Sequence, residues 1–188
     1  MLTKKQRSQE NTVFGVYIKE GLYSLAQSRK NHWMEFFNIF NDKDEWNGVD
    51  LNKVNILFTY SVAAHRLKEL LVSIQNEHVR KNVRPQQSKI ITITDILTGT
   101  KGLVEMDDRY DTVDNKVLIP KLTVKDHLDI IQTKEYAGMY GDSKDIQKRL
   151  LTFYETGINW DESKKFSFPE ATAPKPTQKP LTKEDYLH

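Results

Sequence analysis

Short apolar runs separated by turn residues dominate the chain after residue 12. Val13–Ile18 and Leu22–Ala26 are two such runs, and Gly21 between them is able to adopt the positive φ of a tight hairpin. The next run, Trp33–Phe40, is aromatic and has apolar residues at both alternating positions, as is typical of a strand buried on two sides. The pattern therefore predicts an antiparallel hairpin followed by a buried strand.

A fourth apolar run, Val54–Tyr60, leads into a segment that fits two interpretations. Its apolar residues recur at helical spacing, which favours a helix; they are Ala63, Leu67, Leu70, Leu71 and Ile74. The competing interpretation is a short helical turn followed by a strand over residues 70–75. Both interpretations place the leucines in the core.

The middle of the chain again favours strands. Lys89–Thr94 is rich in β-branched residues, and Gly99–Gly102 has the composition of a turn. Leu103–Met106 then forms a short partner strand, and Val117–Ile119 is predicted to be the last strand before the periodicity becomes helical.

Two helices are predicted in the last third of the chain. Thr123–Asp126 resembles a capping box with Asp in place of Glu, and it precedes a stripe of Val124, Leu128 and Ile131. A second helix is predicted to begin at Asp142 or Ser143 and to end at Gly157. Its apolar face comprises Ile146, Leu150, Phe153 and Tyr154.

This order, mostly strands and then helices, predicts an α+β fold. We expect a strongly bent, mostly antiparallel sheet with two to three helices packed on one side. Residues 1–162 would form one domain whose polar first eleven residues fray, and residues 163–188 would form an extended, Pro-rich C-terminal tail. Phe166, Phe168 and Tyr186 are the side chains able to hold this tail on the domain.

Composition narrows the classes of function. The 188 residues include 28 Lys and Arg against 26 Asp and Glu, a net charge of +2, so the totals give no basic field for nucleic acid. The absence of cysteine excludes disulfides, thiolate zinc sites and cysteine nucleophiles. The sequence shows no signal-peptide core and no apolar run of membrane-spanning length, so we expect a cytoplasmic protein that does not enter a membrane.

Candidate chemistry for catalysis is sparse. His65 and Glu69 have i,i+4 spacing, but two ligands do not make a metal site, and the sequence offers no third. The common phosphate-loop, nucleophile-elbow and dinucleotide motifs are missing. The aromatic strands lack the interleaved Arg and Lys of a base-stacking surface, so core packing explains them better. We therefore predict no enzyme activity, no cofactor, no metal and no direct binding of nucleic acid.

Acidic residues are concentrated in two predicted loops, each of which holds an aromatic residue. The first contains Asp42, Asp44, Glu45 and Asp50 with Trp46, and the second contains Glu105, Asp107, Asp108, Asp111 and Asp114 with Tyr110. Such loops suit the docking of a basic protein, because an aromatic anchor supplies affinity and the charges speed encounter. Ordinary solvated loops would have the same composition, and that alternative stays open. Calcium is a further alternative for the second loop, although the spacing and the central glycine of a calcium loop are missing.

Two further segments carry a family resemblance: Val13–Ile18 with Gly21-Leu22-Tyr23, and the aromatic run Glu35–Phe40. The first is similar to the strand, turn and strand, and the second to the Phe-Phe-Asp-hydrophobic element, of the immunity protein 26 family of bacterial polymorphic toxin systems. The resemblance continues through Leu57–Ala63, Glu135–Tyr140 and Asp145–Leu150 and leaves the Pro-rich tail outside.

The resemblance implies a non-catalytic cytoplasmic protein that binds a cognate toxin domain, often a nuclease, and blocks it through a large interface. The acidic loops would be the first candidates for that interface, and the oligomeric state is left open. The main alternative is a small binding module associated with nucleic acid or with regulation. An enzyme that uses scattered histidines and carboxylates is a third hypothesis.

Overall fold

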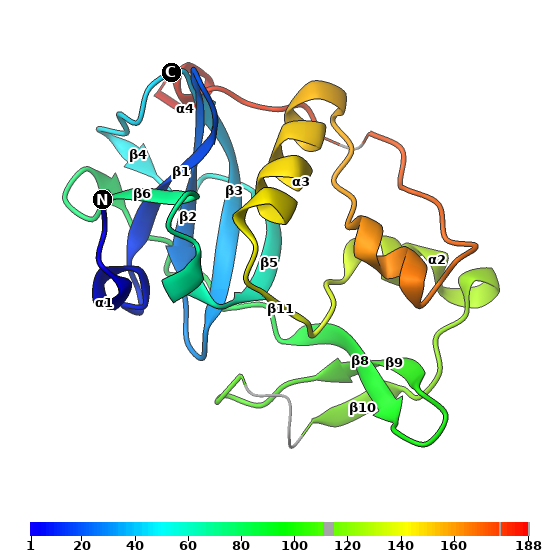
Figure 1. The fold of residues 1–188 in the computed structure, drawn as a ribbon. Coiled ribbons are helices and arrows are strands. Elements are labelled where there is room, and N and C mark those ends of the chain that lie inside the picture. The colour runs from blue at the N-terminus through cyan, green and yellow to red at the C-terminus, as the bar shows by residue number, and fades with distance from the viewer. Residues whose placement is uncertain (111–114, 177, 188) are drawn as a thin grey trace.

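The computed structural model describes residues 1–110, 115–176 and 178–187. Its centre is a six-stranded sheet in the order β11-β5-β3-β2-β1-β6, which is strongly curled (Figure 1). Neighbouring strands run antiparallel except β11 and β5, which are parallel. The strands are β1 (Val13–Lys19), β2 (Leu22–Ser28), β3 (Trp33–Asn41), β5 (Ile56–Val62), β6 (Leu71–Ile74) and β11 (Met139–Tyr140). The predicted α+β class and bent antiparallel sheet are confirmed.

The predicted hairpin and the two-sided burial of the third strand are also confirmed. β1 pairs with β2 as far as Lys19–Leu22, and Gly21 in the turn has a φ of 67°. Every residue of β3 from Trp33 to Phe40 is buried. A strand whose side chains are apolar on both sides of the sheet must be covered on both faces, and both faces of this sheet are covered.

One face of the sheet is covered by α3 (Ser143–Thr156), which crosses it in Figure 1. Asp142 caps the start of this helix and Gly157, with a φ of 71°, ends it, as predicted. Ile146, Leu150 and Phe153 are buried against the sheet. The opposite face is covered by the segment after β3. This segment includes β4 (Val49–Asp50), which pairs in parallel with β7 (Val79–Arg80).

A smaller three-stranded sheet lies beside the large one (Figure 1). It contains β8 (Lys89–Asp95), β9 (Thr100–Glu105) and β10 (Lys116–Ile119), all antiparallel. The three strands were predicted, but as part of one sheet, and the turn predicted over Gly99–Gly102 lies earlier, over residues 96–99. Helix α2 (Val124–Thr133) is capped by Thr123, whose side chain accepts a hydrogen bond from the Asp126 amide. The helix and its apolar stripe were predicted, and the stripe packs with Ile91 and Leu103 of this sheet.

The helix predicted over residues 63–74 is wrong, and the competing interpretation is right. A short 3-10 turn, η1 (Ala64–Arg66), precedes strand β6. The physical reason is the edge of β1: the Tyr17 amide donates to the Leu70 carbonyl at 2.8 Å, and β6 continues the pairing. Leu70 and Leu71 are fully buried, as both interpretations required.

The chain ends also differ from expectation. The N-terminus, predicted to fray, forms helix α1 (Lys4–Arg7), because Thr3 caps it and buried Arg7 donates to the His65 carbonyl at 2.9 Å. After η2 (Glu162–Phe166) the tail is largely extended, as predicted, and ends in α4 (Lys183–Leu187). Phe168 is buried on the domain, whereas Phe166 is 92% exposed.

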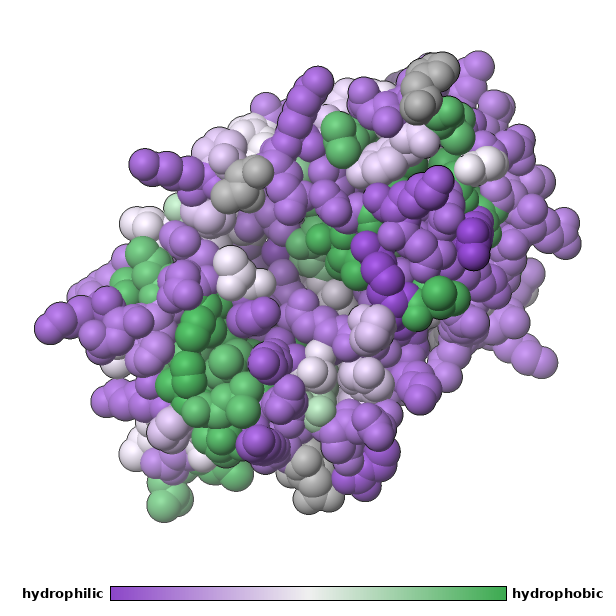
Figure 2. Space-filling model, turned by 180° about the vertical axis from the view of Figure 1, so that it is seen from behind, coloured by the Kyte–Doolittle hydropathy of each residue, from purple (hydrophilic) through white to green (hydrophobic). Residues whose placement is uncertain are grey.

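The surface behind the view of Figure 1 is mostly hydrophilic, with apolar patches that polar side chains separate (Figure 2). Exposed apolar side chains include Ile96 and Leu97 in the turn between β8 and β9 and Val117 on β10. No helix in the described ranges is both long and apolar enough to cross a membrane.

Candidate functional site

The first acidic loop follows the end of β3. Asp42 and Glu45 are exposed, whereas Asp44 and Asp50 are partly buried. The Asp50 carboxylate accepts from the Asn52 backbone amide at 3.0 Å, and hydrogen bonds from Asn52, followed by nearby cations, outweigh desolvation and lower its pKa. Asp42 and Glu45 are therefore the carboxylates of this loop that face solvent.

Trp46, predicted to be an exposed anchor, is 1% exposed and packs on the sheet face opposite α3. Its indole Nε1 donates to Asp44 Oδ1 at 2.8 Å. Gly15 makes room for this arrangement, because a Cβ at that position would lie 2.1 Å from Asp44 Oδ1. The sheet face needs a large apolar cover, and the expectation that Trp46 is an exposed anchor is wrong.

The second acidic loop is tied into the structure at several points. Asp107 Oδ2 accepts from Arg109 Nε at 2.6 Å, and this hydrogen bond lowers the Asp107 pKa. The Tyr110 carbonyl accepts from Trp33 Nε1 at 2.9 Å, and Tyr110 itself is partly buried. Asp108 is exposed and Glu105 is partly buried, while Asp111 and Asp114 lie outside the described residues.

The structure does not bring the two acidic loops together. The second loop contacts Trp33 at the start of β3, and the first follows Asn41 at its end. At about 3.3 Å per residue, the nine residues of β3 separate these points by about 26 Å. The two loops therefore belong to opposite ends of the large sheet.

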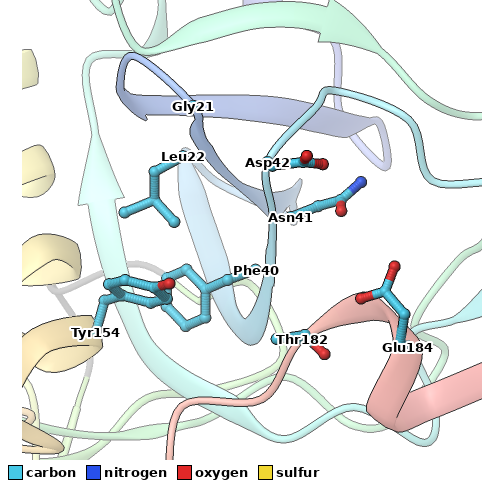
Figure 3. Close-up of a pocket in the computed structure, with 8 residues that line it drawn as sticks. All are labelled: Gly21, Leu22, Phe40, Asn41, Asp42, Tyr154, Thr182 and Glu184. Atoms are coloured by element: carbon cyan, nitrogen blue, oxygen red, sulfur yellow. The ribbon is translucent and has the colours of Figure 1, made fainter.

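A pocket of about 290 Å³ adjoins the first loop (Figure 3). Its apolar side is formed by Leu22, Phe40 and Tyr154, and its polar side by Asn41, Asp42, Thr182 and Glu184, with Gly21 at the hairpin turn. The wall thus combines the β1–β2 turn, the end of β3, helix α3 and the C-terminal segment. Of the predicted site residues, Asp42 lines this pocket.

Tyr154 supplies the aromatic surface that Trp46 does not. Its ring centroid lies 5.1 Å from that of Phe40, and the residue is 39% exposed. A lysine or arginine side chain suits such a pocket, because its aliphatic stem packs on apolar surface while its cationic head meets carboxylates. Asp42 and Glu184 provide these carboxylates.

Sequence reasoning missed a buried polar cluster between α3, β5 and the segment after α2. Arg149 donates to both oxygens of Glu135, at 2.9 and 2.8 Å, and also to the Tyr60 hydroxyl. Burial alone would lower the Arg149 pKa, but the Glu135 charge outweighs burial and holds this pKa above its ordinary value. Arg149 lies three residues from Ile146 on the buried helix face, which was the available signal.

The same cluster contains a second buried cation. Lys164 is fully buried; burial lowers its pKa, and its ammonium lies 5.2 Å from the Trp160 ring centroid. Nearby, the Tyr140 hydroxyl donates to Asp161. Enclosed charges of this kind hold the large sheet to the part of the chain that contains α2. No group of three metal-ligating side chains was found among the described residues.

Comparison with known proteins places the chain in a family. No curated protein and no solved structure matches it significantly. Residues 3–173 match a family described as a domain of unknown function, DUF8309, so that the segment lining the pocket with Thr182 and Glu184 lies outside the match. Because the match covers nearly the whole chain, this protein belongs to the DUF8309 family.

Proposed function

We propose that this protein is an immunity protein that binds a basic toxin domain in the cytoplasm and blocks it by covering its active surface. The observation that carries the proposal is the pocket beside Asp42, whose lining combines this exposed carboxylate with an apolar wall that includes the exposed ring of Tyr154. The resemblance to the immunity protein 26 family supports the same function. The protein would act by contact and would catalyse no reaction.

Of the two acidic loops, the first is the better candidate for the interface. Asp42 and Glu45 are exposed, whereas in the second loop Asp107 is bound to Arg109 and the Tyr110 carbonyl to Trp33. A charge already paired within the chain contributes less to the field that a partner meets. We therefore place the centre of the interface at the end of β3.

Charge reversal tests this assignment with a control in the same chain. In the variant Asp42→Lys/Glu45→Lys, both substituted side chains are exposed, so the melting temperature should stay within about 2 °C. Association with the toxin domain encoded next to this gene should slow by about tenfold or more at low salt. The control Asp107→Lys/Asp108→Lys reverses two charges at the opposite end and should leave association nearly unchanged.

Each outcome has a distinct meaning. Slowed association in the control alone would move the interface to the second loop. Failure of the unsubstituted protein to bind the toxin would overturn the proposed function. Binding to nucleic acid that weakens steeply with salt would instead favour the regulatory or nucleic-acid module.

A further inference from the structure

The C-terminal segment continues the large sheet where β5 leaves it. Pairing of β5 with β3 reaches Phe37, and the Asn38 amide then donates to the Asn55 carbonyl at 2.8 Å. Two residues later, on the same strand edge, the Phe40 amide donates to the Leu181 carbonyl at 2.9 Å. Thr182 forms a parallel bridge with Phe40. The segment thus occupies an open sheet edge, as peptides do in strand addition.

Asn38 recognises the backbone of this segment with both ends of its side-chain amide. Its Nδ2 donates to the Lys179 carbonyl at 3.0 Å, and its Oδ1 accepts from the Leu181 amide at 3.2 Å. Asn38 is 1% exposed, so β3 and its neighbours fix the amide in place. Contacts to backbone atoms do not depend on which side chains the bound segment carries.

Charge complementarity between the segment and the domain is local. The segment carries Lys179 and Lys183 but also Glu184 and Asp185, so its formal net charge is zero. A second pocket, about 440 Å³, lies between the end of α3 and the segment and is lined by both Glu155 and Lys179. The Glu155 side chain is 54% exposed and pairs with Lys19 at 3.5 Å, and the lysine of the segment adds a second cation to the same pocket.

The bound segment and the groove have different relations to the family. Asn38, Phe40 and Asp42 lie within the DUF8309 match, whereas the segment lies beyond its end at residue 173. The connection is exposed over Thr172–Ala173 and contains Pro174 and Pro176. The groove therefore belongs to the family domain, and its occupant is an appended piece of chain.

We propose that the edge of β3 around Asn38 is a binding groove for an extended, lysine-bearing peptide. Residues 178–187 occupy it as a tethered ligand, and an extended segment of the basic partner takes their place. The partner's identity rests on the proposed function, but the groove and its exchange with a peptide do not.

The test uses the full chain and a fluorescent peptide with the sequence of residues 178–187. In the variant Leu181→Pro the tail loses the amide that Asn38 binds, so the groove should open to the added peptide. Because a short tether gives an effective concentration of about 1 mM, the variant should bind the peptide about tenfold or more tightly than the unsubstituted chain. Fluorescence anisotropy gives both affinities.

Matched peptides separate groove binding from nonspecific attraction. A peptide with N-methyl-leucine at the position of Leu181 should bind the variant at least tenfold more weakly, because it lacks the same donor. A peptide with glutamate in place of Lys179 and Lys183 should also bind more weakly. Equal binding of all three peptides, or binding of none, would overturn the proposal.

Hydrogen exchange of the unsubstituted chain provides a second measurement. The Phe40 amide should exchange faster than amides at the centre of β3, because its hydrogen bond to the Leu181 carbonyl protects it only while the tail is docked. Exchange as slow as that of the strand centre would mean that the tail does not leave, and would refute the proposal. The peptide and exchange experiments contain no toxin, so they do not depend on the proposed function. If the protein failed to bind a toxin, the peptide results would still stand, and if the peptides failed to bind the groove, the toxin experiment would still stand.

Discussion

The buried ion pair between Glu135 and Arg149 gives the sharpest prediction about stability. Its side chains are 4% and 5% exposed, and two hydrogen bonds join the guanidinium to the carboxylate. In the variant Glu135→Gln, Arg149 stays charged and buried but loses its counterion and one of the two acceptors. The Tyr60 hydroxyl remains, but it carries no formal charge.

The structure allows the magnitude to be worked out. Removing one partner of a buried ion pair typically costs about 3–5 kcal/mol, because the remaining charge is left without compensation. For a chain of this size, each kcal/mol lowers the melting temperature by about 2–4 °C, so a loss of about 6–20 °C is expected. Urea unfolding followed by circular dichroism measures the free energy, and a thermal scan measures the shift.

Glu155 supplies a matched control for this substitution. It pairs with Lys19 at 3.5 Å, and both side chains are about half exposed, so Glu155→Gln should cost less than about 1 kcal/mol. A second control removes both buried charges: Glu135→Gln combined with Arg149→Met should cost less than the sum of the single losses. If Glu135→Gln lowered the unfolding free energy no more than Glu155→Gln does, the inference that Glu135 compensates a buried charge on Arg149 would be refuted.

Three further substitutions test the packing around the site. Burial opposes ionisation of Asp161, but the hydrogen bond from Tyr140 and a nearby guanidinium hold its pKa below the ordinary value of 3.8. The unsubstituted protein should therefore be more stable than Asp161→Asn at pH 7 and should lose this advantage as the pH falls below about 3.8. Urea unfolding of both proteins at pH 7 and below pH 3.8 measures the difference in unfolding free energy, and a difference that stays constant would contradict this prediction. Gly15→Ala should cost about 1–3 kcal/mol, since its Cβ would meet Asp44 Oδ1 at 2.1 Å, and a loss under about 0.5 kcal/mol would argue against that contact. Trp46→Ala should lower the unfolding free energy by about 3–5 kcal/mol, whereas an exposed anchor would leave it unchanged.

Elements with local signals were predicted well from the sequence. Helix α3 is the clearest case, because Asp142 and Gly157 mark its ends and its apolar residues repeat with helical period. The hairpin at Gly21 follows equally from a turn residue between two apolar runs. Each of these signals lies within a few residues of the structure it specifies.

Errors arose where a distant part of the chain decided the outcome. The leucines around Leu70 have a spacing that fits a helix, but the open edge of β1 draws them into a strand. Trp46 lies among acidic residues, and nothing local shows that the opposite face of the sheet requires its ring. Arg149 did carry a signal, as a cation on an apolar helix face, but its partner Glu135 is identified only by the fold.

The binding of the C-terminal segment could not be predicted from the sequence, for a reason that bears on function. Asn38 is one of two polar residues, with Glu35, in the aromatic run Trp33–Phe40, and the segment it holds has no apolar period. Their contacts join a side-chain amide to backbone atoms, so they leave no pattern in the sequence of the bound segment. For the same reason, a different sequence is able to make the same contacts, and a groove of this kind is suited to exchange its own tail for an extended segment of a partner.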